Sequence, residues 1–352
     1  MSLCIISFTE KGLLLSERIA KYYSDVKIYT KCAALAADEA VEHRYVEQAI
    51  TEWAGVQMAE RNPLLFIGAC AIAVRAIAPW VTDKLCDSPV LVMDEKGEFV
   101  IPILSGHVGG ANELARHLAG QLGATAVITT ATDINEKFAV DLFAGQNRLH
   151  IVEREGIAKV SAKVLAGKTV TLSVETGHMD ESVKLPGEVT CVSYPPEGDV
   201  DIIVSGKKEA CRALITLRPK EYVIGMGCKR GKEPDKIEAL IRKNLEEAGI
   251  LQEQIYALAS IDLKKDEEGF LVWSKKNRIP FLTFSAEELQ EVPGLFQSSD
   301  FVKEQVGVDN VCERAALCAC GKRGKIILAK KATDGMTIAI AKREWSVLFD
   351  GK

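Results

Sequence analysis

Residues 64–78, LLFIGACAIAVRAIA, contain the pattern that decides the fold. Four apolar residues lead to Gly68, and a helix-like stretch then runs from Cys70 to Ala78. A short buried strand that turns through a glycine into a helix is the repeating unit of a parallel α/β sheet. Arg75 within the stretch and the prolines that flank it argue against a membrane span. These residues therefore predict one strand and one helix of an α/β domain.

The same alternation continues on both sides of this stretch. Apolar runs of strand length lie at 3–8, 26–29, 89–93, 99–104 and 126–130. Helical patterns lie at 13–23, 43–61 and 113–122. The segment Asp94-Glu95-Lys96-Gly97 is typical of a hairpin turn. The N-terminal part of the chain is therefore predicted to be a parallel sheet with one hairpin, flanked by helices.

The rest of the chain predicts two further α/β domains. From 135 to 219 the expected helices and strands are short, and Arg218-Pro219-Lys220 is the best linker candidate. A new strand begins at Tyr222 and leads into a glycine-containing loop and a helix from 234 to 248. We expect three domains, at 1–134, 135–219 and 220–352. The fold class is therefore multi-domain α/β, with open, mostly parallel sheets flanked by helices.

Composition excludes several classes of protein. The 352 residues include 44 Lys and Arg against 49 Asp and Glu, which gives a net charge of −5. This balance argues against a nucleic-acid coat or a protein of anionic membrane surfaces, so local basic groups must meet any anionic ligand. The N-terminus has neither a basic leader nor a long apolar stretch, and ten cysteines are scattered. We therefore expect a cytoplasmic protein with reduced thiols.

The strongest candidate site is Ser105-Gly106-His107-Val108-Gly109-Gly110-Ala111-Asn112, between a predicted strand and a predicted helix. Its three glycines would leave bare backbone N–H groups at a helix N-terminus, which suits an anion. We expect Asn112 to cap the helix and His107 to be the titratable group. Alternatively, the glycines only permit a tight turn and His107 points to solvent. Neither dinucleotide-binding nor Walker spacing is present.

A second candidate anion site is the predicted loop Gly225-Met226-Gly227-Cys228-Lys229-Arg230-Gly231. Its glycines, Gly225 and Gly227, would expose backbone, and Lys229 and Arg230 could pair with carboxylates. Cys228 could be a thiolate whose pKa these cations lower. The alternative is a tight turn with a solvated basic tip and a small buried cysteine.

Three other features are weaker candidates. Cys312, Cys318 and Cys320 lie in an alanine-rich helical pattern, which favours buried thiols over a metal site. Glu313, at the start of that pattern, either caps the helix or acts on a ligand. Arg75 either reaches a ligand carboxylate or extends to solvent.

A polar segment also follows the predicted strand at 126–130. Thr132 and Asp133 belong to Thr129-Thr130-Ala131-Thr132-Asp133. Open α/β sheets bind ligands at the carboxyl ends of their strands, so these side chains are ligand-binding candidates. The alternative is a polar turn without a ligand.

Three segments, 66–79, 104–115 and 129–133, resemble in order and spacing the CbiG family, the cobalt-precorrin-5A hydrolases of anaerobic cobalamin synthesis. Residues 223–339 are similar to the family's C-terminal domain, which also occurs as a separate protein. Ala71 stands where the family usually has glycine, and Arg314 where proline commonly follows the Val-Cys-Glu motif.

The resemblance implies a reaction and its substrate. The δ-lactone of cobalt-precorrin-5A would be opened with water, and C20 with its methyl would leave as acetaldehyde, giving cobalt-precorrin-5B. Cobalt would arrive within the substrate, so no cofactor or metal of the protein's own is expected. Neither nucleic acid nor membrane is an expected partner, and other enzymes of the cobalamin pathway remain possible partners. The alternative function is a non-catalytic tetrapyrrole carrier.

Given the reaction that the resemblance implies, we expect particular roles for the candidate residues. His107 and Glu313 are the candidate catalytic base or acid. The other candidates would bind the acetate and propionate groups of the macrocycle. They are Arg75, Ser105, Gly106, Gly109, Gly110, Asn112, Thr132, Asp133, Gly225, Gly227, Lys229 and Arg230.

Overall fold

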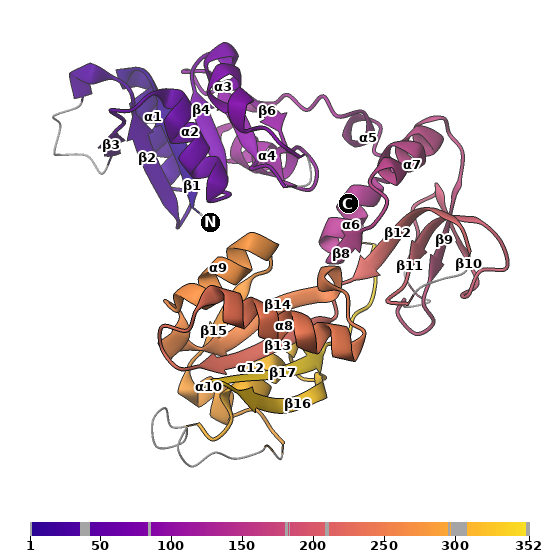
Figure 1. Ribbon diagram of the computed structural model, residues 1–352. Coiled ribbons are helices and arrows are strands. Elements are labelled where there is room, and N and C mark those ends of the chain that lie inside the picture. Colours follow the sequence, from indigo (N-terminus) through magenta and orange to yellow (C-terminus); the bar gives the residue numbers. More distant parts are fainter. Residues whose placement is uncertain are drawn as a thin grey trace. The chain divides into compact units, whose positions relative to one another are not determined.

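The computed structural model describes residues 2–35, 43–83, 86–179, 182, 184–207, 211–294, 296 and 308–349. The chain forms two compact units, Met1–Leu142 and Phe143–Lys352. The strands fall into three sheets, within 3–126, 149–219 and 222–342 (Figure 1). The predicted multi-domain α/β fold class is confirmed.

The first unit is a seven-stranded sheet in the order β3-β2-β1-β4-β5-β6-β7. Its strands are β1 Leu3–Ser7, β2 Val26–Thr30, β3 His43–Tyr45, β4 Leu64–Ile67, β5 Val90–Met93, β6 Phe99–Leu104 and β7 Thr125–Ala126. Its helices are α1 Glu10–Ala20, α2 Ile50–Ala59, α3 Cys70–Ile77, α4 Ala111–Leu122 and α5 Ala131–Ile134, with 3-10 turns η1 Ala33–Leu35 and η2 Ala78–Trp80. Strands β1, β4 and β5 are wholly buried, which explains their unbroken apolar runs.

Helices cover both faces of this sheet. One apolar cluster joins the strands to α2 and α3 through Trp53, Met58 and Ala76. The other joins them to α1 and α4 through Ile19 and Leu118. The predicted hairpin is confirmed, because β5 and β6 pair antiparallel. Since β6 and β7 are parallel, the segments that follow them leave the sheet at the same edge.

Two predictions for the first unit are wrong. Residues 43–45 form β3, which pairs with β2, and helix α2 begins only at Ile50. The strand expected at 126–130 ends at Ala126. In both places pairing with a neighbouring strand determines where the strand begins and ends, and the local sequence does not reveal that pairing.

The second unit holds two five-stranded sheets, in the orders β10-β9-β11-β12-β8 and β15-β14-β13-β17-β16. The first contains β8 Leu149–Ile151, β9 Val170–Val174, β10 Val189–Val192, β11 Val200–Val204 and β12 Ala213–Pro219. The second contains β13 Tyr222–Cys228, β14 Ile255–Ile261, β15 Phe281–Phe284, β16 Lys325–Thr333 and β17 Met336–Lys342. The helices are α7 Glu155–Leu165, α8 Pro234–Ala248, α9 Glu268–Asn277, α10 Ala286–Gln290 and α12 Val311–Cys320, with 3-10 turns η3 Gln252–Gln254 and η4 Asp262–Lys264. Helix α6, Val140–Gln146, crosses the boundary between the units.

The linker expected at Arg218-Pro219-Lys220 coincides with the boundary between the two sheets of the second unit, but most of it belongs to a strand. Arg218 and Pro219 are the last residues of β12 and pair with β8. Proline lacks a backbone N–H, but the end of a strand tolerates that loss. The backbone N–H of Lys220 donates to the carbonyl oxygen of Arg148, so this segment is fixed rather than a free connection.

The glycine-containing loop expected at 225–231 is largely wrong as well. Gly225 and Gly227 lie within β13, which pairs with β14 on one side and β17 on the other. A Cβ on Gly225 would lie 1.8 Å from the carbonyl oxygen of Cys312 in α12. The glycine is needed because α12 packs directly on the strand, and it offers no free backbone loop to an anion.

We expect Gly225→Ala to destabilise the second unit by about 1–3 kcal/mol or more, because the added methyl collides with helix backbone that cannot rotate away. Gly198→Ala is the control, since nothing lies within 4 Å of its would-be Cβ. Urea unfolding of both variants measures the difference. Equal stability of the two variants would contradict the close packing of α12 on β13.

Candidate functional site

The candidate site begins in the tight loop between β6 and α4. Ser105 has φ 55° and Gly110 has φ 84°, both left-handed conformations. A Cβ on Gly109 would lie 2.3 Å from the Cβ of Ser105, so only glycine fits there. The Ser105 hydroxyl donates to the carbonyl oxygen of Asp87 at 2.9 Å. The loop is therefore closed tightly on itself and on the segment before β5.

Three of the N–H groups at the start of α4 are used inside the loop. Gly110 donates to the His107 carbonyl oxygen, Ala111 to that of Ser105 and Asn112 to that of Gly106, at 2.8, 3.1 and 3.0 Å. The expectation of bare N–H groups is wrong for these three residues. Loop carbonyls satisfy the first donors of α4, which a helix N-terminus otherwise leaves unpaired.

The prediction that Asn112 caps α4 is also wrong. Gly110 occupies the N-cap position, and no side chain bonds there. The buried Asn112 side chain instead donates to Thr130 Oγ1 at 3.1 Å and to Asp133 Oδ2 at 2.9 Å. It thus joins α4 to the segment that follows β7.

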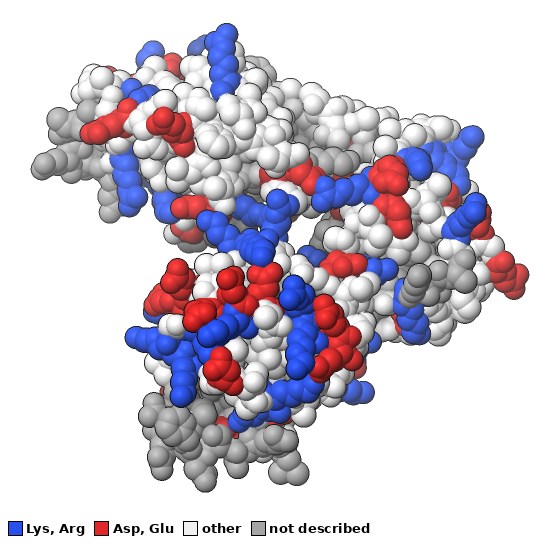
Figure 2. Space-filling view, viewed as in Figure 1, with Lys and Arg blue, Asp and Glu red and all other residues white. Residues whose placement is uncertain are grey.

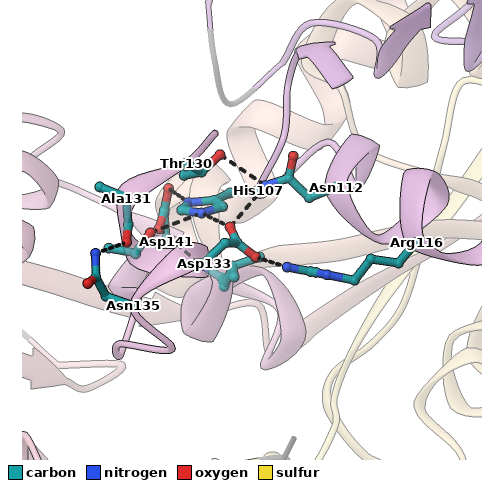
Figure 3. Close-up of polar contacts among 10 residues, drawn as sticks. His107, Asn112, Arg116, Thr130, Ala131, Asp133, Asn135 and Asp141 are labelled. Atoms are coloured by element: carbon teal, nitrogen blue, oxygen red, sulfur yellow. Dashed lines mark hydrogen bonds and ion pairs between the residues drawn. The ribbon is translucent and has the colours of Figure 1, made fainter. Parts of the chain in front are cut away.

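His107 is the centre of this network, and the alternative that it points to solvent is wrong. Its Nε2 lies 2.6 Å from Asp133 Oδ2, and its Nδ1 lies 3.4 Å from Asp141 Oδ2. The Thr132 hydroxyl lies 3.1 Å from Nε2. Figure 3 shows the imidazole ring flanked by the two carboxylates. The His107 side chain is 15% exposed, so solvent can still reach it.

Asp133 is held as an anion. Arg116 Nη2 donates to Asp133 Oδ1 at 2.6 Å, and the Asp133 side chain is only 3% exposed. Burial opposes ionisation of the carboxyl, but hydrogen bonds from Arg116 and Asn112 and the charge of His107 together hold the pKa of Asp133 below its usual value. A carboxylate fixed in this way can orient and stabilise an imidazolium.

The His107 pKa is raised above its ordinary value. The hydrogen bond with Asp141 is the largest cause, burial opposes it, and the charges of Asp141 and Asp133 add to the rise. His107 therefore carries a proton over a wider pH range than a free histidine. Imidazole is the side chain whose unperturbed pKa lies nearest neutral pH, so it can give and take a proton in one catalytic cycle.

Sequence reasoning missed Arg116 and Asp141. Arg116 follows Asn112 by four residues on α4, so helical spacing places both on one face. Asp141 is a buried acid within the apolar stretch 138–144, and an acid in such a stretch usually has a partner. These two signals could have suggested both residues, but neither signal identifies His107 or Asp133 as the partner.

The remaining candidate of the first unit is Arg75. It lies on the exposed side of α3, whose buried residues Ala73, Ala76 and Ile77 face the sheet. Its guanidinium therefore extends toward solvent, as the second interpretation expected. Thr132 and Asp133, by contrast, both contact His107 from the short helix α5.

Glu313, in the second unit, is buried at the start of α12, with 4% of its surface exposed. One oxygen accepts a hydrogen bond from the Asn310 side chain, and the other accepts one from the backbone N–H of Lys330 at 2.7 Å. Asn310 is itself the N-cap of α12. One carboxylate oxygen thus holds the N-cap residue of α12 and the other ties the helix start to β16, which is the geometry of a structural role.

The basic and thiol groups of the second unit differ in accessibility. Lys229 and Arg230 are exposed just after β13, and Figure 2 shows Lys and Arg side chains lying among Asp and Glu side chains over this sheet and its helices. Burial raises the pKa of Cys228 to about 11, so it is a thiol and not an activated thiolate. Among the described residues, no group of three or more His, Cys, Asp and Glu side chains is placed to hold a metal ion.

No helix in the described ranges combines the length and apolar character needed to cross a membrane.

Two family models match the chain, one within each unit. The model described as Cobalamin synthesis G N-terminal matches residues 52–133, and that described as Cobalamin synthesis G C-terminus matches residues 222–341. The chain is 37% identical to the cobalt-precorrin-5A hydrolase of Salmonella typhimurium strain LT2, over 79% of this chain and 81% of that protein. It is 32% identical to the cobalt-precorrin-5A hydrolase of Priestia megaterium, over 96% and 94%. Protein CobE of a Sinorhizobium species matches 34% of this chain at 28% identity, over 78% of its own length.

We expect the pair of His107 and Asp133 to stabilise the fold most strongly between about pH 4 and 6.5. The raised pKa of His107 contributes stability that is lost as the pH rises through its folded pKa. The lowered pKa of Asp133 contributes stability that is lost as the pH falls through its folded pKa. His107→Gln should therefore cost roughly 1–3 kcal/mol at pH 5.5 and clearly less at pH 9, measured by urea unfolding.

His117→Gln is the control for this experiment, because His117 contacts Tyr23 and neither acid of the site. A destabilisation by His107→Gln that is the same at both pH values would show that the charged pair does not form.

Proposed function

The chain belongs to the CbiG family of cobalt-precorrin-5A hydrolases, and we propose that it opens the δ-lactone of cobalt-precorrin-5A and releases the two-carbon bridge as acetaldehyde. Water adds to the lactone carbonyl and the lactone C–O bond breaks, which leaves a carboxylate and an alcohol. The alcohol then loses its proton, its carbon–carbon bond to the macrocycle breaks, and acetaldehyde leaves. The electron pair of that bond stays with the macrocycle, which becomes cobalt-precorrin-5B.

The observation that carries this proposal is the position of His107 between two buried carboxylates. Both chemical steps move a proton, so the reaction needs a group that can accept and donate one. Asp133 holds Nε2 at 2.6 Å, whereas Asp141 lies 3.4 Å from Nδ1. Nδ1 is therefore the less tightly held nitrogen. We assign proton exchange with water and the substrate alcohol to Nδ1, and orientation of the ring to Asp133.

Asp133 has a second role in this mechanism. When His107 takes a proton from water, positive charge develops on the ring next to the carboxylate. Arg116 and Asn112 already hold that carboxylate in place, so no group must move at that moment. The arrangement lowers the energy of the imidazolium without making Asp133 itself a base.

The acetate and propionate groups of the macrocycle need cations and N–H donors. We propose that the exposed Arg75, Lys229 and Arg230 meet some of these carboxylates. We assign the remaining contacts to the loop at Ser105, Gly106 and Gly109, with the Thr132 hydroxyl beside the ring of His107. A protein of net charge −5 needs such local groups to hold an anionic ligand.

We further propose that cobalt enters with the substrate and that the protein supplies no cofactor of its own. Its ten cysteines are all free, which suits the reducing cytoplasm. Other enzymes of the cobalamin pathway would supply the substrate and take up the product.

His107→Ala should lower kcat for acetaldehyde release from cobalt-precorrin-5A by roughly 10²–10⁴-fold and change KM little, because a general acid or base acts on turnover more than on binding. His117→Ala removes a histidine outside the site and should keep full activity. Acetaldehyde formation by each purified variant measures both constants.

A His107→Ala variant that keeps its turnover rate and only binds substrate more weakly would contradict the assignment. Glu313 would then be the next candidate for proton transfer, and the kcat and KM of Glu313→Gln would test that role. Binding of the macrocycle without any acetaldehyde from the unchanged protein would favour the carrier function.

Dialysis against a chelator before the assay should leave acetaldehyde release from cobalt-precorrin-5A unchanged, because the metal is part of the substrate. The cobalt content of the recovered macrocycle is the control that the substrate kept its metal. Loss of activity that an added divalent ion restores would show that the protein needs a metal of its own.

A further inference from the structure

Helix α6 carries one of the two carboxylates of the candidate site. Asp141 lies in its first turn, and its Oδ2 is 3.4 Å from His107 Nδ1. Asn147 follows the last residue of the helix, and its side chain donates to the Phe143 carbonyl oxygen at 2.9 Å. At a rise of about 1.5 Å per residue, Asp141 and Asn147 are about 9 Å apart along one rigid element. A constraint at Asn147 therefore acts on the position of Asp141.

The C-terminal segment, residues 345–349, supplies that constraint. The Asn147 amide group donates to the Leu348 carbonyl oxygen at 2.9 Å and accepts from the Leu348 backbone N–H at 2.7 Å. The ring of Phe349 stacks on that of Phe143 in α6, with centroids 4.6 Å apart and planes at 24°. One side-chain amide thus pairs with both backbone groups of Leu348, and an aromatic stack lies beside it.

The other end of the C-terminal segment is fixed as well. The buried Trp345 donates from Nε1 to Glu221 at 3.0 Å, and its ring stacks on His178 at 3.8 Å. The Val347 backbone N–H donates to the carbonyl oxygen of His178 at 2.8 Å. The C-terminal segment is therefore held at Trp345 and Val347, so the contacts of Leu348 and Phe349 act on α6 from a fixed base.

We propose that Asn147 and Phe349 are positioning residues, which fasten the C-terminal segment to α6 and thereby hold Asp141 at the imidazole ring of His107. An effect of these residues on kcat rests on the proton-transfer role proposed for His107, whereas an effect on the titration of the His107 ring does not. Among the described residues, the charged groups paired around the ring are Asp133 on α5 and Asp141 on α6, and Arg116 on α4 pairs with Asp133. Only Asp141 is reached through the C-terminal segment.

The test is the titration of the His107 ring, followed by nuclear magnetic resonance in the full chain without substrate. Asp141→Asn removes the largest cause of the raised pKa and should lower the midpoint toward that of a free histidine. Asn147→Ala and Phe349→Ala should each lower the midpoint in the same direction. Combining Asn147→Ala with Asp141→Asn should add nothing further, because both changes act through the same carboxylate.

Two exposed neighbours give matched controls. Gln146→Ala changes the end of α6, and Ser346→Ala changes the C-terminal segment. Both should leave the titration of His107 unchanged, and thermal unfolding checks that every variant is folded. If Phe349→Ala does not fold, Asn147→Ala still tests the proposal, because Asn147 is partly exposed and its replacement is tolerated more easily. A folded Asn147→Ala protein in which His107 titrates as in the unchanged chain, while Asp141→Asn shifts it, would overturn the proposal.

Kinetics then separate this inference from the proposed function. Misplacing Asp141 should lower kcat for acetaldehyde release by roughly 10- to 100-fold with little change in KM. A shifted titration with unchanged kcat would support the positioning of Asp141 and contradict the role of His107 in turnover. An unchanged titration with unchanged kcat would contradict the positioning alone.

Discussion

The candidate site depends on the hydrogen-bonded ion pair between His107 Nε2 and Asp133 Oδ2, 2.6 Å apart. A carboxylate as buried as Asp133 is stable only with several donors, and Asn112, Arg116 and His107 supply them. These donors come from the loop after β6 and from α4, while Asp133 lies on α5 after β7. The pair therefore joins the segments that leave two parallel strands at one edge of the sheet.

The glycine-rich segments of the two units have different structural roles. Between β6 and α4, Gly110 adopts a left-handed conformation and Gly109 makes room for Ser105, so the chain can turn and place His107. In β13, Gly225 permits α12 to pack on the strand. Glycines thus shape the loop of the candidate site in one unit and permit helix packing in the other.

Much of the fold follows from local pattern, and the parts that do not follow depend on distant partners. Unbroken apolar runs identified the buried strands β1, β4 and β5, and turn residues identified the hairpin. The edge strand β3 and the end of β12 were missed because their backbone is decided by pairing with β2 and β8. His107 could be selected from its glycine-rich loop, but its pairing with Asp133 and Asp141 requires the chain to be folded.

The most direct test of this account compares two independent pKa values for the same protein. One is the pKa of the His107 ring, measured by nuclear magnetic resonance in the free enzyme. The other is the pKa that limits kcat/KM for acetaldehyde release from cobalt-precorrin-5A, which reports an essential group of the free enzyme. We expect the two values to agree, both to exceed the ordinary histidine value, and Asp141→Asn to lower both together. A kinetic pKa that stays in place while the pKa of His107 falls would contradict this account.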